Sequence, residues 1–267
     1  MTFTGPDISS HQHPPDRIDF GAVATAGHSF AIVKLTEGSS YSNPYGAQDC
    51  ADARAAGLEV APYHWVSPGA ASVQLTNLVP ALHLAGFQSG DLVWLDFEEA
   101  GATEDTLHGI GAGLEARGFR VGVYTFPYFW AQTGNPGCVT CPRWPLWFAD
   151  YNVPANRAAP LPWSVVTLRQ TNGTSVAIPG IPGLNDMSHA ENGGEFIIWP
   201  HLRPMEDAMP RLVTEDGHLV YGIDGVGHAW HVPGMELEKA LVATGIYGDG
   251  TIHPLPVGSI QTMTLVQ

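Results

Sequence analysis

Residues 91–99 read Asp-Leu-Val-Trp-Leu-Asp-Phe-Glu-Glu, and this stretch indicates both the fold and a candidate site. The run 92–97 is almost wholly apolar, which is typical of a strand buried on both faces. Asp96 and Glu98 stand at its carboxyl end, two positions apart. Because side chains alternate across a strand, both acids would project from one face, with Cα atoms roughly 6–7 Å apart.

Two interpretations of this acid pair are open. Carboxyl groups at about that spacing carry out glycoside hydrolysis, in which one acid protonates the leaving oxygen and one carboxylate faces the positively charged transition state. Acids at the end of an apolar strand are also costly to bury unless they have a function. The alternative is an ion-paired or helix-capping pair at a strand-to-helix turn.

The first 190 residues alternate short apolar strands with helical patterns. Strands are expected at 30–35, 58–66, 92–97, 119–125, 145–149 and 165–170. Helices are expected at 45–57, 72–85 and 103–118, and no clear helix separates the last two strands. The sequence therefore predicts an α/β fold, an irregular TIM-like (β/α) barrel that is incomplete in helices.

The composition excludes several classes of protein. A chain of 267 residues, 44% hydrophobic and 14% charged, suits one large globular domain, or a domain of about 200 residues with a small module. The net charge of −15 argues against a nucleic-acid partner, because phosphate binding depends on Lys and Arg. No segment approaches the ~18–20 apolar residues of a transmembrane helix, so no membrane insertion is expected.

The cysteines give little sign of a metal or cofactor. Cys138-Val-Thr-Cys141 has the spacing of a zinc-binding pair, but no second pair or nearby histidine cluster completes a site. The 12 histidines are scattered, without H-E-x-x-H spacing. A local disulfide or two free thiols are the interpretations left open, and neither a metal nor a cofactor is expected.

Acids and aromatic residues stand where the predicted strands end. A barrel builds its site at the carboxyl ends of its strands. Aromatic faces there could cover the C–H surfaces of sugars, while carboxylates and amides bind hydroxyls. Each aromatic residue taken alone could equally belong to the core. The residues at these ends are Asp7, Glu37, Tyr63, Trp65, Asp96, Glu98, Tyr124, Trp147 and Gln170, with Asn185, Asp186 and Ser188 expected after a last strand.

Seven segments in this order resemble the lysozymes of glycoside hydrolase family 25, which cut peptidoglycan as muramidases. Together they span residues 1 to about 190. The segments are Asp7-Ile-Ser-Ser-His-Gln12, Phe30-Ala-Ile-Val-Lys-Leu-Thr-Glu-Gly38, Pro62-Tyr-His-Trp65, Leu95-Asp-Phe-Glu98, Gly122-Val-Tyr124, Leu146-Trp-Phe-Ala-Asp-Tyr151 and Gly180-Ile-Pro-Gly-Leu-Asn-Asp186.

The resemblance implies a barrel of about eight strands and five helices. It also implies that Glu98 is the catalytic acid, and that Asp96, Asp7 and Asp186 are the other carboxylates of the cleft. The substrate-binding residues expected with them are Tyr63, Trp65, Tyr124, Trp147, Gln170 and Glu37. The chain departs from the family in one strand, where the usual Trp-Gln-Tyr reads Arg-Gln-Thr at 169–171. This difference concerns the subsite nearby and the sugar preference.

The pattern changes after about residue 198. Strands are expected at 211–214 and 218–223, joined by a hairpin turn, then at 228–232, and a short helix at 235–244. This predicts a family 25 domain over 1–198 and a small α+β module over 199–267. The position of the module resembles that of wall-binding modules, although a domain that only stabilises or oligomerises is an alternative.

These features predict a lysozyme that hydrolyses the β-1,4 bond between N-acetylmuramic acid and N-acetylglucosamine, with bacterial peptidoglycan as its partner. Whether Asp96 would act directly or by assisting the substrate's N-acetyl group is open. Residues 1–7 carry no secretory signal, so a phage endolysin held in the host cytoplasm until release to the wall is expected. Alternatives are a virion structural protein with a lysozyme domain and a non-catalytic carbohydrate-binding protein. The oligomeric state is open.

Overall fold

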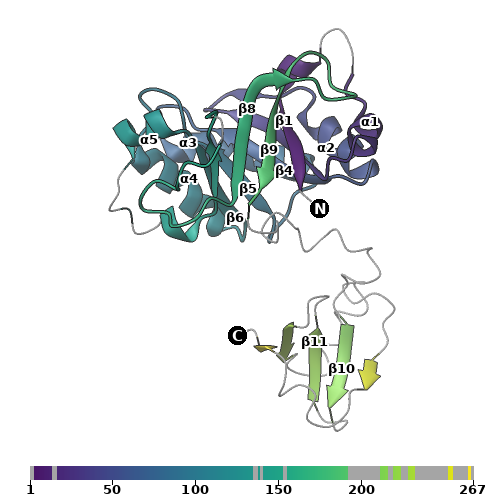
Figure 1. Cartoon of the computed structure of the whole chain (residues 1–267). Helices are drawn as coiled ribbons and strands as arrows, with labels where there is room; N and C mark the ends of the chain where they lie inside the picture. The colour runs from purple at the N-terminus through teal and green to yellow at the C-terminus, as the bar shows by residue number, and fades with distance from the viewer. Residues whose placement is uncertain are drawn as a thin grey trace. The chain divides into compact units, whose positions relative to one another are not determined.

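A computed structural model of the chain describes residues 3–13, 17–134, 138, 141–152 and 155–191, and five short strands after residue 210 (Figure 1). The chain divides into two compact units, residues 1–198 and 199–267. Each unit is described by itself.

The first unit is a closed barrel of eight strands, as the sequence predicts. Adjacent strands run parallel around the barrel, apart from the last strand, which is antiparallel to both of its neighbours. A two-residue strand, β3 (Tyr41–Ser42), extends the sheet from the second strand. In spatial order the barrel strands are β1 (Thr4–Ile8), β2 (Phe30–Glu37), β4 (Glu59–Trp65), β5 (Leu92–Asp96), β6 (Arg120–Thr125), β7 (Leu146–Ala149), β8 (Leu168–Val176) and β9 (Asn185–Ala190).

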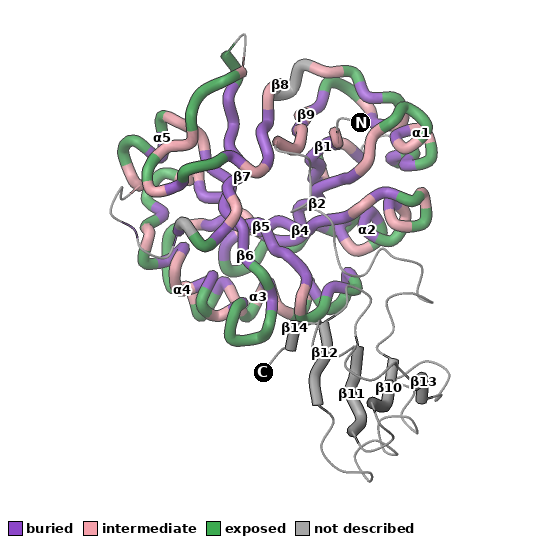
Figure 2. Tube along the Cα trace, turned by 60° about the horizontal axis from the view of Figure 1, so that its bottom comes forward, coloured by how far each residue is buried: buried purple, intermediate pink, exposed green. Residues whose placement is uncertain are grey.

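Five α-helices accompany these strands, in agreement with the prediction. In Figure 2 the strands form a mostly buried ring, and the helices lie outside it with their exposed faces turned to solvent. Between β7 and β8 the described residues form no α-helix, as expected. The helices are α1 (Phe20–Thr25), α2 (Gly46–Ala55), α3 (Ala71–Leu84), α4 (Glu104–Glu115) and α5 (Pro127–Thr133).

Helix α5 was not expected from the sequence. It has only seven residues and begins with a proline followed by three aromatic residues, which gives it a weak helical pattern. Packing stabilises it instead, because the rings of Phe129 and Trp130 lie 5.0 and 6.4 Å from that of Phe97. Phe97 follows β5 directly, so α5 is fixed to the strand that carries the acid pair.

Because side chains alternate along each strand, they pack in two separate regions, one between the strands and the helices and one inside the barrel. Val93 and Leu95 face outward, into the apolar layer beneath the helices. Trp94 faces the barrel interior, where its ring lies 5.8 Å from that of Trp147 on β7. Tyr63 of β4 also reaches Trp147 at 6.3 Å, although β4 and β7 are not neighbours. Such contacts are possible only across the inside of the barrel, so the interior is filled by aromatic side chains.

The second unit contains a five-stranded sheet in the order β13-β10-β11-β12-β14. Strands β10 (Arg211–Glu215), β11 (Leu219–Ile223) and β12 (His228–His231) are antiparallel neighbours, which confirms the three strands expected there. Two more strands, β13 (Ile252–Pro254) and β14 (Thr264–Leu265), pair parallel at the edges. The helix expected at 235–244 lies outside the described residues.

Among the described residues of the chain, no helix is long and apolar enough to span a membrane.

One glycine makes room for the aromatic interior. A Cβ atom at Gly122 on β6 would lie 2.4 Å from Cε3 of the Trp94 ring, which is fully buried. We therefore expect Gly122→Ala to destabilise the barrel by about 1–3 kcal/mol through overpacking, measured as a lower melting temperature in calorimetry. The control is Gly21→Ala, because the new Cβ on helix α1 would meet only Asp19 Oδ1, at 3.2 Å. Equal losses for both variants would contradict a packing role for Gly122.

Candidate active site

The predicted site residues gather at one end of the barrel. Those on β2, β4, β5 and β6 stand at or near the carboxyl ends of parallel strands, which meet at the same rim. Trp147 and Gln170 lie early in β7 and β8, and Gln170 pairs with Ala149 at the end of β7. Asp186 was expected to follow a last strand, but it lies within β9, near its start. Because β9 runs antiparallel, its start reaches the same rim, and Asp186 pairs directly with Asp7 of β1. The antiparallel strand thus delivers a fourth acid to the site.

The acid pair keeps the alternation predicted for it, although β5 itself ends at Asp96. The backbone ladder continues one residue further, because the Phe97 N–H donates to the Tyr124 carbonyl over 2.9 Å. Phe97 packs outward against Phe129 on α5. Asp96 and Glu98 therefore face the interior end of the barrel together, with Asp96 buried and Glu98 half-buried.

The environment of Glu98 raises its pKa to about 7. Burial makes the largest contribution, because it disfavours the charged carboxylate. The negative charge of Asp186 raises the pKa further, whereas the Tyr124 hydroxyl and the Lys34 ammonium lower it. A carboxyl group with this pKa keeps a large fraction of its protons near neutral pH and can donate one.

Asp96 lies deeper, with 5% of its surface exposed, and its Oδ1 atom has no hydrogen-bond partner among the described residues. Burial raises its pKa well above the usual range, and the charge of Glu98 adds to this. Lys34 acts in the opposite direction and favours the ionised form. Oδ1 of Asp96 is thus a buried hydrogen-bond acceptor that no described residue satisfies.

Asp7 is held by a hydrogen-bonded network from the opposite wall. Gln170 Nε2 donates to Asp7 Oδ2 over 2.8 Å, and Gln170 Oε1 accepts from the hydroxyls of Tyr124 and Tyr151 at 3.0 and 2.5 Å. Burial raises the pKa of Asp7 most, and the charges of Asp186 and Glu98 raise it further, while the Gln170 amide lowers it. Asp7, Asp96 and Glu98 thus all have raised pKa values, and negative charges of neighbouring acids contribute to each of them.

Lys34 is the positive charge of the cluster. It is buried, and its Nζ donates to Glu37 Oε2 over 2.6 Å. The same Nζ lies 4.6 Å from the ring of Trp65, whose indole N–H donates to Glu99 Oε2 over 2.8 Å. Glu99 therefore orients Trp65 from the side, while Glu37 is paired with Lys34 at the rim.

A cleft of about 690 Å³ opens beside Glu98. Its walls are largely aromatic, and the exposed rings of Tyr128 and Tyr151 stand at its edge, at 69% and 55% exposure. The residues that line it are Glu98, Tyr124, Phe126, Pro127, Tyr128, Ala131, Ala149, Asp150, Tyr151, Asn152 and Arg157.

Three of the four predicted substrate-binding aromatics, Tyr63, Tyr124 and Trp147, are buried, and of these Tyr124 lines the cleft. Tyr63 is 8% and Trp147 2% exposed. The ring of Trp147 lies 4.5 Å from that of Tyr124, and its indole N–H donates to Ser188 Oγ over 3.0 Å. Tyr63 and Trp147 support the site from within the barrel.

The sequence reasoning missed Lys34, Tyr128 and Tyr151 as site residues. Lys34 could have been found, because a lysine within the apolar run 30–35 must meet a counter-charge if it is buried. Tyr128 could not, because it depends on the unexpected helix α5. Among the described residues, donor atoms close enough to share one metal ion lie elsewhere, next to α4.

The departure at 169–171 affects the outer face of β8. Arg169 alternates with Gln170, and its guanidinium donates to Asp150 Oδ2 over 3.1 Å and to the carboxylate of Glu191. It is buried at 3% exposure. The arginine thus ties β8 to the end of β7 and to the chain after β9, while Gln170 keeps its place inside.

Comparisons with known proteins agree with this architecture. The sequence model of glycosyl hydrolases family 25 matches residues 6–175. A probable GH family 25 lysozyme 2 of Dictyostelium discoideum is 31% identical over 159 residues, covering 56% of this chain and 72% of that protein. The solved structure of a bacterial lysozyme from Streptomyces coelicolor aligns with a TM-score of 0.62 at 22% identity, over 73% of this chain and 94% of the other.

The catalytic domain of the endolysin ply40, from a bacteriophage of Listeria monocytogenes, also shares the fold. It aligns with a TM-score of 0.56 at 18% identity, covering 72% of this chain and 94% of that domain. The likeness to both solved structures shows the barrel.

The charge of Asp186 offers a test of the electrostatics. We expect Asp186→Asn to lower the pKa of Glu98 below its value of about 7, because removing a nearby negative charge favours the ionised form of Glu98. Carboxyl carbon shifts of isotope-labelled glutamate, followed against pH by NMR, measure this directly. Asp52→Asn is the control, because Asp52 lies on helix α2, away from the barrel rim, beside Arg17. An unchanged pKa in Asp186→Asn would contradict the coupling.

Proposed function

The chain belongs to glycosyl hydrolase family 25 and is a muramidase that hydrolyses peptidoglycan. We propose that it cuts the β-1,4 bond between N-acetylmuramic acid and N-acetylglucosamine, and that Glu98 is the general acid. The observation that carries the proposal is the half-buried Glu98 at the edge of the cleft, with its pKa raised to about 7. Departure of a sugar oxygen needs a proton, and Glu98 holds one in the pH range where it must give it up.

Asp96 supplies the complementary negative charge. As the glycosidic bond breaks, positive charge develops on the anomeric carbon and ring oxygen. An ionised Asp96 stabilises this charge, and its unpartnered Oδ1 is free to accept a hydrogen bond from the N-acetyl group of the sugar. Lys34 favours the ionised form of Asp96, against the burial that raises the pKa of this carboxyl group. The two acids thus take different roles in the same pocket.

The aromatic walls of the cleft bind the glycan. The rings of Tyr128, Tyr151 and Phe126 offer apolar faces to the C–H surfaces of pyranose rings, and Asn152 and Arg157 offer hydrogen-bond donors at the rim. Gln170 holds Asp7 by a hydrogen bond, and the negative charge of Asp186 raises the pKa of Glu98.

The assignment of the acid is tested by Glu98→Gln. The amide keeps the shape of the side chain but has no transferable proton, so we expect turnover to fall by at least about 10²–10⁴-fold while binding to walls persists. Asp96→Asn should also be severe, because it removes the charge that stabilises the transition state. The measurement is the release of new reducing ends from bacterial walls, which should carry N-acetylmuramic acid. N-acetylglucosamine ends, or released peptides, would contradict the muramidase assignment.

Glu99→Gln is the matched control for Glu98→Gln. Glu99 accepts the indole N–H of Trp65 rather than facing the cleft, and a glutamine oxygen can accept it as well. We expect this variant to keep most of its activity. If Glu99→Gln were as damaging as Glu98→Gln, or if Glu98→Gln stayed active, the assignment of the acid would be wrong.

We further propose that the protein is a phage endolysin whose second unit binds the cell wall. The likeness of the barrel to a phage endolysin domain supports the first part. The separate compact unit over 199–267 supports the second, because a small sheet domain that follows a catalytic barrel is suited to targeting. Detection of the chain in lysate but not in purified particles is the expected result. Its presence in particles would favour a virion protein instead.

The targeting role is tested by a chain that ends at residue 198. We expect it to fold and to cut soluble wall fragments as the whole chain does, because residues 1–198 form one compact unit. It should sediment less with whole walls, since the second unit is missing. Unchanged sedimentation would remove the targeting role, and insolubility of the shorter chain would show that residues 199–267 stabilise the barrel instead.

A further inference from the structure

Two cysteines, a histidine and a glutamate meet on the outer side of the barrel, beneath helix α4. Glu104 and His108 stand four residues apart on α4, so they share one helix face. Cys138 and Cys141 belong to the loop between α5 and β7. One ligand-type atom from each residue lies within 4.8 Å of all the others.

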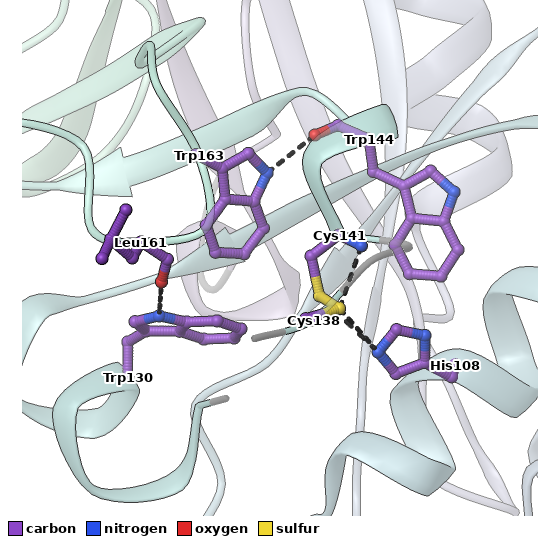
Figure 3. The surroundings of a disulfide bond; sticks show 7 residues. All are labelled: His108, Trp130, Cys138, Cys141, Trp144, Leu161 and Trp163. Atoms are coloured by element: carbon purple, nitrogen blue, oxygen red, sulfur yellow. Dashed lines mark hydrogen bonds between the residues drawn. A yellow bond between two sulfur atoms is a disulfide. The ribbon is translucent and has the colours of Figure 1, made fainter. Parts of the chain in front are cut away.

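The two nitrogen–sulfur distances in this cluster are close to those between the ligands of a tetrahedral metal, once the two bonded sulfurs separate. His108 Nε2 lies 3.3 Å from Cys138 Sγ and 3.6 Å from Cys141 Sγ (Figure 3). Zinc bonds of ~2.3 Å to sulfur and ~2.0–2.1 Å to nitrogen, opened to a tetrahedral angle, place such atoms about 3.6 Å apart. A single ion could therefore bind both sulfurs and the ring nitrogen with small movements.

The surroundings suit a structural metal site. Cys138 and Cys141 are buried, at 7% and 0% exposure, while Glu104 and His108 are half-buried. The backbone N–H of Cys141 donates to Cys138 Sγ over 3.0 Å, a contact that would stabilise this sulfur as a thiolate ligand. The Trp144 ring lies 5.4 Å from that of His108 and covers it.

In the structure the two sulfurs are joined as a disulfide, with Cα atoms 5.7 Å apart. A disulfide alone gives no reason for an imidazole nitrogen and a carboxylate to converge on both sulfurs. A set of two thiols, one imidazole and one carboxylate is the donor chemistry that zinc prefers. We propose that in the reduced chain Cys138, Cys141, His108 and Glu104 bind one zinc ion, and that the disulfide is the oxidised form of the same site.

The two forms exchange by a balanced reaction. Reduction breaks the S–S bond with two electrons and two protons from a dithiol, which itself becomes a disulfide. Zinc then displaces the two thiol protons to solvent and binds the two thiolates. In a reducing compartment the thiols persist and the metal form dominates, whereas in an oxidising one the disulfide does.

The zinc form would fasten helix α4 to the loop after α5, whereas the disulfide joins two residues of that loop to each other. This loop follows α5, and α5 contributes Pro127, Tyr128 and Ala131 to the wall of the cleft. The sequence did not predict a metal because Cys-x-x-Cys had no histidine near it along the chain. The fold supplies His108 from thirty residues earlier.

The test is metal content in the whole chain with its cysteines reduced. The protein is purified without oxygen in a phosphine, which takes oxygen from water as it reduces the disulfide and, unlike a dithiol, competes little for zinc. We expect one zinc ion per chain by mass spectrometry, and none after oxidation. Cys138→Ser and His108→Ala should weaken zinc binding by at least about 100-fold in competition with a chelator. Cys50→Ala and His83→Ala are the controls, since Cys50 lies buried on α2 and His83 is exposed on α3.

Cobalt titration of the reduced, unmutated chain keeps the proposal testable if a variant does not fold. Cobalt bound by two thiolates in a tetrahedral site gives a thiolate-to-metal charge-transfer band and intense visible bands, and zinc should abolish both. Reduced protein without these bands, zinc bound equally well by Cys138→Ser, or a disulfide that the phosphine leaves intact in the folded chain would each overturn the proposal.

Discussion

Four carboxyl groups share one end of a closed barrel, and the cost of burying their charge organises the structure around them. A single carboxylate moved from water into such a site would simply take up a proton. Here the cost is divided, because Lys34 offsets part of the charge near Asp96 and Glu98, and Gln170 satisfies Asp7. The remaining imbalance appears as raised pKa values. The raised pKa of Glu98, about 7, follows from this imbalance.

The layered arrangement behind the rim keeps these groups in place. Trp94, Trp147 and Tyr63 fill the inside of the barrel, so the acids rest on rigid aromatic rings. Outside the strands, Phe97 fixes α5, and α5 in turn carries the tyrosine at the edge of the cleft. The segment formed by β5 and the two residues after it thus places Asp96 and Glu98 in the site, and through Phe97 it also places the α5 wall of the cleft.

Much of the fold and part of the site were accessible from the sequence, for a physical reason. Buried parallel strands have a strong local pattern, and their carboxyl ends must meet, so this pattern alone places residues such as Asp96, Tyr124 and Gln170 together. Features that depend on contacts between distant segments could not be predicted in this way. Helix α5 forms because Phe129 and Trp130 pack against Phe97, which lies 32 and 33 residues earlier in the chain, and no local pattern indicates that contact. The direction of β9, and the meeting of His108 with Cys138, are of the same kind.

The order in which the strands of the barrel close has a consequence for synthesis of the protein. Asp7 lies on the first strand and Asp186 on the last, and they face each other only when β9 has entered between β8 and β1. During translation, every other site residue leaves the ribosome before Asp186 does. The carboxyl cluster is therefore complete only once β9 has paired with β1 and β8, and a chain that stops before β9 lacks one of the acids.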